Sequence, residues 1–198
     1  WQIDVDEFYQ PQDINAVIQI LQDDHSITTM SFKTLTFWGA PDYLVDGWYL
    51  RRGAEIFHRL FKWGKGYRYI THRQPTVHNA QGHYALLLPK HVTEKSDYYS
   101  HAEWAQRDGA LNWAQNAYLQ LKQPYRVHNV YDFPSWLERY RGDHPPQILA
   151  MWQDVTAENS GYDIRQTDDI ELLLNSVQYR IGRQFVRWSN RPALLWKA

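Results

Sequence analysis

Two sets of side chains in this sequence have the chemical types that bind metal ions. Asp4 and Asp6 are separated by one residue, and in a strand this spacing places both carboxylates on one face, where oxygen ligands hold magnesium in phosphoryl-transfer sites. His72, His78 and His83 lie in a histidine-rich region, and imidazoles on adjacent strands can converge on zinc. The histidine spacing matches no zinc signature, and the aspartate pair has low specificity because no third carboxylate can be assigned to it. We therefore expect solvated acids and ordinary strand or turn histidines, with no bound cofactor.

The stretch 48–73 combines cations with aromatic rings. Guanidinium and ammonium groups pair with phosphates, and rings stack on bases. At 100° per residue the apolar side chains of its first part share one arc and the charged side chains share the opposite arc, which predicts a helix over 48–63. Trp48 falls on the charged arc, one turn from Arg52, and an ordinary solvated helix face is the alternative interpretation. The predicted surface for an anionic partner consists of Trp48, Arg52, Arg59, Lys62, Lys65 and Arg68.

The net charge of -1 conceals a strong segregation of charges along the chain. Residues 1–50 hold eight acids and one base, and residues 51–90 hold eight bases and one acid. Residues 91–171 are again acidic, whereas 172–198 carry five bases and no acid. Such blocks either pair with one another in the fold or expose faces of opposite sign to partners. We favour internal pairing, and a basic face that binds nucleic acid or an acidic protein is the alternative.

Composition excludes several classes of protein. The 198 residues contain no cysteine, which rules out disulfide frameworks, thiolate zinc sites, iron-sulfur clusters and cysteine nucleophiles. No apolar run approaches the roughly 18 residues of a membrane-spanning helix, so the sequence predicts a soluble protein. Serine hydrolase elbows, phosphate-binding glycine loops and dinucleotide fingerprints are also missing. The cytoplasm is the favoured compartment, with a processed exported protein as the alternative.

The order of the expected elements favours a single α+β domain, 1–198, with an antiparallel or mixed sheet. A long strand is expected over 27–37. An antiparallel hairpin is expected near 67–88, and its second strand is apolar on both faces and therefore central. Several amphipathic helices pack on the sheet, and one of them is capped by Thr167 and carries an apolar stripe. A weak domain boundary falls near 144–147.

Three other segments have less decisive patterns. A short helix is expected at Trp136–Arg139, after Pro134. The segment 147–155 is apolar without a clear period, so it fits a helix or a strand. The segment 185–197 is expected to form a final strand that is interrupted at Pro192.

Three functions are compatible with these features. The first is a non-enzymatic binding or scaffold domain that holds an anionic partner, either nucleic acid or an acidic protein, through basic and aromatic residues. The second is a divalent-metal-dependent phosphoryl-transfer or nuclease-like enzyme that uses Asp4, Asp6 and the hairpin histidines. The third is a carbohydrate-binding module, because Trp and Tyr dominate the 16% of residues that are aromatic and both pack while presenting a polar group. We rank the three in this order.

Overall fold

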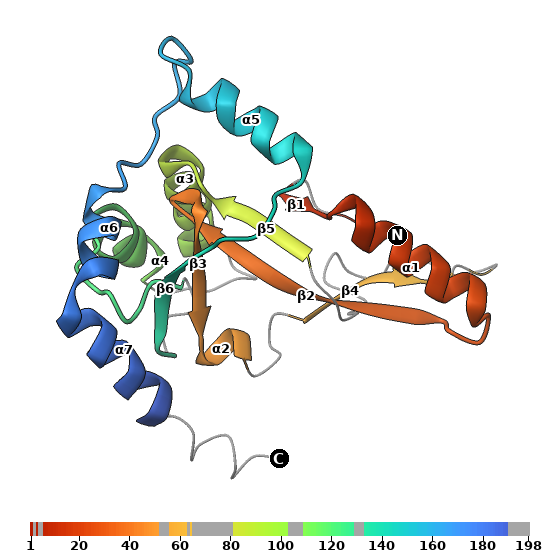
Figure 1. The fold of residues 1–198 in the computed structure, drawn as a ribbon. Coiled ribbons are helices and arrows are strands. Elements are labelled where there is room, and N and C mark those ends of the chain that lie inside the picture. Colours follow the sequence, from red (N-terminus) through yellow and green to blue (C-terminus); the bar gives the residue numbers. More distant parts are fainter. Residues whose placement is uncertain are drawn as a thin grey trace.

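The protein has an α+β fold in which helices lie around a mixed sheet (Figure 1), as the sequence predicted. The structure is a computed structural model that describes residues 1, 3, 6–51, 56–62, 64, 81–102, 109–128 and 133–189. Within these ranges the elements are, in chain order, β1 (Glu7–Phe8), α1 (Pro11–Asp23), β2 (Thr29–Trp38), β3 (Ala40–Gly47), α2 (Trp48–Arg51), β4 (Ile56–Phe61), β5 (Gln81–Leu86), α3 (Pro89–His101), α4 (Ala110–Trp113), the π-helical turn η1 (Ala114–Leu119), β6 (Ser135–Arg139), α5 (Pro146–Thr156), α6 (Asp168–Asn175) and α7 (Val177–Ser189).

The long strand β2 organises the sheet. Its second half pairs in parallel with β5 and antiparallel with β3, and its first half pairs antiparallel with β4. β1 adds to β5 and β6 adds to β3, both antiparallel, so the order along the sheet is β1-β5-β2-β3-β6. β5 is therefore an interior strand, as predicted from its apolar sequence. Its expected hairpin partner, from residue 67 onward, lies outside the described residues.

Both faces of the sheet are covered around the end of β2. Threonine and aromatic residues dominate this strand, and such residues fit a pleated, packed surface. The register of β2 is irregular between Phe37 and Trp38, but in the regularly paired β3 the consecutive residues Leu44 and Val45 face opposite sides of the sheet and pack in different clusters. Phe37 belongs to an apolar cluster with Tyr84 and Ile148, whereas Trp38 belongs to the main core. The strand thus connects two hydrophobic clusters on opposite sides of the sheet.

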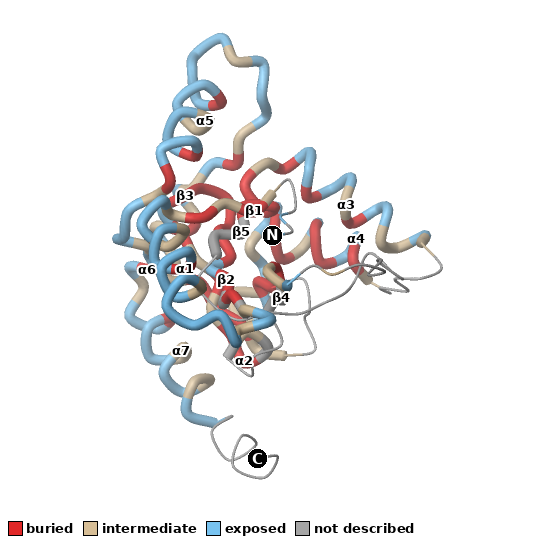
Figure 2. The backbone as a smooth tube through the Cα atoms, turned by 90° about the vertical axis from the view of Figure 1, so that its right-hand side faces the viewer, coloured by how far each residue is buried: buried red, intermediate tan, exposed pale blue. Residues whose placement is uncertain are grey.

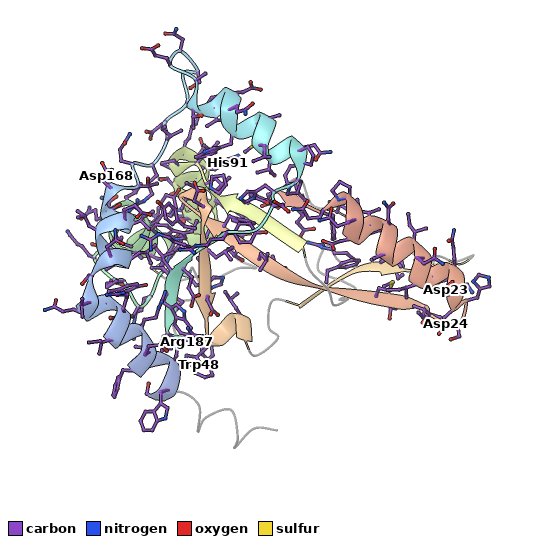
Figure 3. The ribbon with its side chains drawn as sticks, in the orientation of Figure 1. Asp23, Asp24, Trp48, His91, Asp168 and Arg187 are labelled. Carbon is purple, nitrogen blue, oxygen red and sulfur yellow. The ribbon has the colours of Figure 1, made fainter. Side chains whose placement is uncertain are left out.

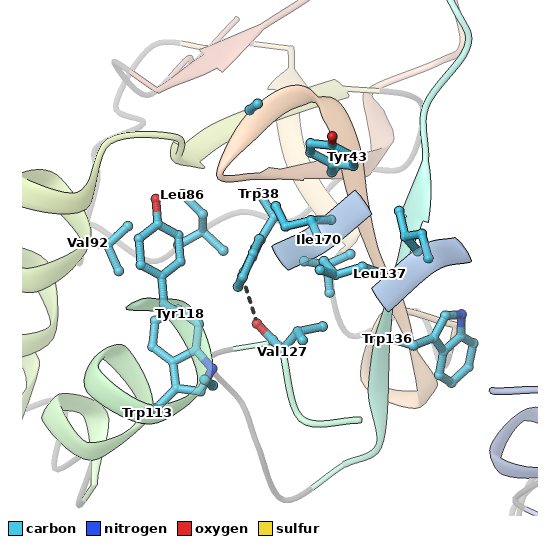
Figure 4. Packing of buried hydrophobic residues seen from close by; sticks show 14 of the residues in the cluster. Trp38, Tyr43, Leu86, Val92, Trp113, Tyr118, Val127, Trp136, Leu137 and Ile170 are labelled. Atoms are coloured by element: carbon cyan, nitrogen blue, oxygen red, sulfur yellow. Dashed lines mark hydrogen bonds between the residues drawn. The ribbon is translucent and has the colours of Figure 1, made fainter. Parts of the chain in front are cut away.

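Figure 4 shows the main core, where large aromatic and aliphatic side chains meet. The indole of Trp38 is fully buried and donates a hydrogen bond of 3.1 Å to the carbonyl of Val127. The guanidinium of Arg165 lies 4.7 Å from the Trp38 ring centroid and pairs with the carboxylate of Asp169. A buried cation is therefore satisfied by a ring and a carboxylate together. The other core residues drawn and labelled are Tyr43, Leu86, Val92, Trp113, Tyr118, Trp136, Leu137 and Ile170.

The helices have strongly asymmetric burial. Figure 2 shows buried residues concentrated in the strands, while the outer sides of α1, α5 and α7 are exposed. The α1 helix begins at Pro11 and places Asp13 in its first turn, which is favourable for the helix dipole. Among the described residues, no helix is both long enough and apolar enough to cross a bilayer.

The predicted helix over 48–63 is wrong. Only Trp48–Arg51 is helical, and Ile56–Phe61 is strand β4, which pairs with the first half of β2. The apolar residues of this segment recur with a helical period, but aromatic and β-branched residues also favour strands. The sequence pattern therefore fits either structure. Pairing with a distant strand decides between the two. Residues 52–55 lie outside the described part of the chain.

Two further expectations are corrected. Trp136–Arg139 does not form a helix but belongs to β6, which pairs with β3 in a register that places Leu137 opposite Val45. The segment expected to be a final strand is helical as far as Ser189, the last residue of α7, and residues 190–198 lie outside the described ranges. The ambiguous segment 147–155 is helical and belongs to α5.

Candidate functional site

The basic and aromatic surface predicted from the sequence is only partly described. Trp48 is 2% exposed, and its indole Nε1 donates a hydrogen bond of 3.2 Å to the carbonyl of Val186. Arg59 is also buried and pairs with Glu7. These two residues therefore stabilise the fold and do not form an exposed surface. Lys62 is exposed, and the remaining members, Arg52, Lys65 and Arg68, lie outside the described residues.

The weak metal candidates are not brought together by the described structure. The Asp6 carboxylate accepts a hydrogen bond of 3.0 Å from the ammonium of Lys95. His83 lies in β5 at the position paired with Glu7, and Asp4, His72 and His78 lie outside the described ranges. Among the described residues, no group of three or more His, Asp or Glu side chains could hold a metal ion.

The helix α7 is fixed to the body of the protein by its inner side. β6 pairs with β3 along one edge, and the other edge faces α7. There the amide of Leu137 donates a hydrogen bond of 2.9 Å to the hydroxyl of Tyr179, and Arg183 donates one of 3.2 Å to the Leu137 carbonyl. Side chains of α7 thus satisfy backbone groups that an edge strand would leave free.

A shared carboxylate gives α7 a second attachment. Glu138 Oε1 accepts a hydrogen bond of 2.9 Å from the Trp136 indole and one of 3.4 Å from Arg187, and Arg183 lies 4.0 Å away. The Arg187 guanidinium also lies 5.8 Å from the Trp136 ring centroid. In Figure 3, Arg187 and Trp48 lie close together where α7 passes α2. The contacts of Arg183 and Arg187 with Glu138 therefore fix the orientation of α7 relative to β6.

The opposite side of α7 is an apolar surface that no described residue covers. We call it the outer stripe and define it as Val177, Ile181, Phe185 and Trp188, which are 58%, 66%, 65% and 66% exposed. Leu172 on α6 is 75% exposed. Single exposed apolar residues are common, whereas contiguous exposed apolar patches are less so.

Basic residues flank the outer stripe on one side. Arg180 is exposed, and Arg183 and Arg187 share the carboxylate of Glu138. The sequence 172–198 has five bases and no acid, so nothing on α7 itself opposes this positive charge. The outer stripe with its basic flank can bury apolar groups and attract negative charge at the same time.

A second cluster surrounds His144, just before α5. Its ring centroid lies 4.9 Å from those of Phe37 and Tyr140, and its Nδ1 lies 3.1 Å from the Tyr84 hydroxyl. Burial lowers the pKa of His144 and raises the pKa of Tyr84. Both groups are thereby kept neutral, which suits a packed aromatic cluster that holds α5 on the sheet.

A cleft of about 530 Å³ lies where α4 meets the segment 123–126. One wall is Trp113, which is buried, and another is Tyr125, whose ring stacks on Tyr179 of α7 at 5.3 Å. The cleft is lined by both polar and apolar side chains. Its lining residues are Gly109, Asn112, Trp113, Gln123, Pro124, Tyr125 and Arg126.

Sequence reasoning missed the outer stripe. The helix that the sequence predicts after Thr167 has an apolar stripe of Ile170, Leu173, Leu174, Val177 and Ile181 that is expected to face the core, and Phe185 is expected in a strand, whereas the structure has two helices, α6 and α7, and exposes Val177, Ile181 and Phe185. The helical spacing of 177, 181, 185 and 188, in a segment with no acid, was the signal that could have identified it. No family model, no curated protein and no solved structure matches this chain.

Proposed function

We propose that this protein is a non-enzymatic binding domain that docks an anionic partner through the outer stripe of α7 and its basic flank. The single observation that carries the proposal is the exposure of four large apolar side chains in one row, next to Arg180. Water disfavours such a row, and covering it on binding is the dominant favourable term in most association reactions. The positive flank adds attraction to a negatively charged partner and repels a positively charged one.

This proposal keeps the function class that the sequence favours, a binding domain for an anionic partner. It places the binding surface on α7 and not on the stretch 48–68. The expected surface included Trp48 and Arg59, which instead support the fold through Val186 and Glu7. The aromatic and basic character is found again on α7, where Phe185 and Trp188 are exposed. The partners first to be tested are therefore those predicted at the outset, nucleic acid and acidic protein.

The phosphoryl-transfer alternative has no specific observation in its favour. It required Asp6 to act as a free oxygen ligand, whereas this carboxylate forms an ion pair with Lys95. The carbohydrate alternative needs an exposed aromatic platform beside hydrogen-bonding groups. Phe185 and Trp188 instead form one row with Val177 and Ile181, and such a row suits an apolar contact better than a hydroxyl-rich ligand.

The test is binding of labelled single-stranded DNA, RNA, polyglutamate and acidic lipid vesicles at low and moderate salt. We expect at least one of them to bind, with an affinity that falls as salt screens the charges. Arg180→Glu should weaken that binding by about tenfold, and Arg141→Glu, at another exposed arginine, should leave it unchanged. Failure of all four probes at low salt, or equal losses in the two variants, would contradict the proposal.

A further inference from the structure

The geometry of α7 defines what kind of surface can cover the outer stripe. At 100° per residue the four stripe residues fall within an arc of about 80°. Arg180 and Arg187 lie roughly 60° and 80° beyond one edge of this arc. The 13 residues of α7 extend over about 20 Å at 1.5 Å per residue. The helix therefore presents a narrow, straight apolar strip with cations along one side.

The inner arc of α7 is occupied by the protein itself. Tyr179 is buried and stacks on Tyr125, and the Val186 carbonyl accepts the hydrogen bond from Trp48. The strip consequently faces away from the body along the outside of the molecule, where Figures 1 and 2 show α7 at the rim with an exposed outer side.

The composition of the strip distinguishes among negatively charged partners. Bases stack on rings, so a nucleic acid would cover Phe185 and Trp188 but would leave Val177 and Ile181 in water. A hydrocarbon boundary accepts all four side chains, and tryptophan is especially favoured where hydrocarbon meets polar headgroups. Leu172 on α6 is also exposed.

The charge pattern fits an anionic lipid layer. Helices that lie in the plane of a membrane interface combine large apolar residues on one face with Arg or Lys at the polar side. Arg180 lies beside the strip, about 60° from its edge, from where a long cationic side chain can reach headgroup phosphates while its stem remains in apolar surroundings. After α7 the sequence adds Arg191, Lys197 and the run Ala193-Leu194-Leu195-Trp196, again without an acid.

We infer that α7 is an interfacial helix that docks the protein on an anionic lipid surface, with the outer stripe inserted among headgroups and acyl chains. This inference rests on the proposed function, because it names the partner of the same surface. A bilayer needs no groove that is complementary in shape to the strip. It needs only apolar residues on one side and cations beside them, and α7 provides both. The body of the protein, attached through Tyr179, Arg183 and Arg187, would remain in water above the bilayer.

The test is flotation of the intact protein with vesicles of phosphatidylcholine, with and without phosphatidylserine. We expect binding to the mixed vesicles, much weaker binding to phosphatidylcholine alone, and partial release by salt. Ile181→Ser combined with Phe185→Ser should reduce binding by more than tenfold. The matched control is Ile18→Ser combined with Ile20→Ser, which alters exposed apolar residues of α1 and should leave binding unchanged. Circular dichroism verifies that both double variants are folded.

A second variant makes the test independent of any packing change in α7. Arg180→Glu reverses an exposed charge and should reduce binding to mixed vesicles without affecting the weak binding to phosphatidylcholine. Failure to bind vesicles, together with stripe-dependent binding of DNA, RNA or polyglutamate, would overturn the lipid inference and leave the proposed function intact. Failure of all probes would overturn both. Equal vesicle binding by the wild type and the stripe variant would also overturn the lipid inference.

Discussion

The environment of His144 couples the position of one side chain to pH. Burial of the ring lowers its pKa below the ordinary value of 6.5. The carboxylates of Asp42 and Asp143 and a hydrogen bond with the backbone of Pro41 act in the opposite direction but are weaker. The neutral ring therefore predominates in the folded protein, with its Nδ1 at 3.1 Å from the Tyr84 hydroxyl. Protonation would place a charge among aromatic rings.

We predict that His144 reduces the stability of the protein at acid pH. The unfolded chain binds a proton near pH 6.5 that the folded protein binds only at lower pH. The free energy of unfolding is therefore highest above that value, and the contribution of His144 is lost as the pH falls from 6.5 toward the lowered pKa. Denaturant titrations across this pH range should show that the free energy of unfolding falls less for His144→Gln than for the wild type.

The matched control for this prediction is His91→Gln. His91 is exposed on α3, so its substitution should leave the dependence of stability on pH as it is in the wild type. Parallel pH profiles for the wild type and His144→Gln would show that the ring titrates normally in the folded protein.

At the scale of one element, α5 has a buried and an exposed side in consecutive residues. Ile148 is fully buried in the cluster with Phe37 and Tyr84, whereas Leu149 is 48% exposed. We predict that Ile148→Ala lowers the free energy of unfolding by about 2–5 kcal/mol, as for other large-to-small changes in a core. Leu149→Ala serves as the control and should change it by less than about 0.5 kcal/mol. Similar losses from the two substitutions, measured by chemical denaturation, would contradict the placement of α5 on the sheet.

Helices and strands whose own residues favour their structure were predictable from the sequence. The strand β2 has a continuous run of strand-favouring residues, and α1 has apolar residues at helical spacing after Pro11. The α+β class and the interior position of β5 followed from the same kind of reasoning. In each of these cases local preference and tertiary packing favour the same structure.

Elements that depend on distant partners were not predictable in the same way. β4 and β6 both have patterns that a helix could satisfy, and each becomes a strand because it pairs with a strand far away in sequence. The outer stripe of α7 was missed for a related reason. An apolar stripe in a helix predicts burial, and Ile181 and Phe185 are exposed only because Tyr179 and Val186 occupy the inner side.

At the scale of the whole molecule, several described ion pairs join segments of opposite charge that are distant in sequence. Glu7 of the acidic first block pairs with Arg59 of the basic second block. Glu138, from the acidic third block, pairs with Arg187 of the basic last block. Internal pairing therefore accounts for part of the segregated charge, as we favoured from the sequence. Arg180 lies in the same basic block and is exposed, which leaves positive charge beside the outer stripe.

Three buried tyrosines connect the stability of the whole molecule to alkaline pH. Tyr118 and Tyr179 belong to the main core, and Tyr84 belongs to the cluster on the opposite face of the sheet. Burial raises the pKa of each of them above the ordinary value of 10. Because the neutral hydroxyl is favoured in the folded state, each contributes stability that is present below pH 10 and is lost as the pH rises further.

We predict cooperative alkaline unfolding in which tyrosinate absorbance from the buried rings appears together with the loss of helical circular dichroism. Clusters on both faces share β2, so one transition should expose all three rings. Tyr118→Phe removes a hydroxyl that donates to the Leu87 carbonyl. This substitution should lower the free energy of unfolding at neutral pH by about 1 kcal/mol. It should also make the decline of that free energy above pH 10 less steep. The control is Tyr162→Phe, at a residue that is 59% exposed, and it should change neither quantity. Buried-tyrosine ionisation that precedes the loss of circular dichroism would show that one face of the sheet opens before the other.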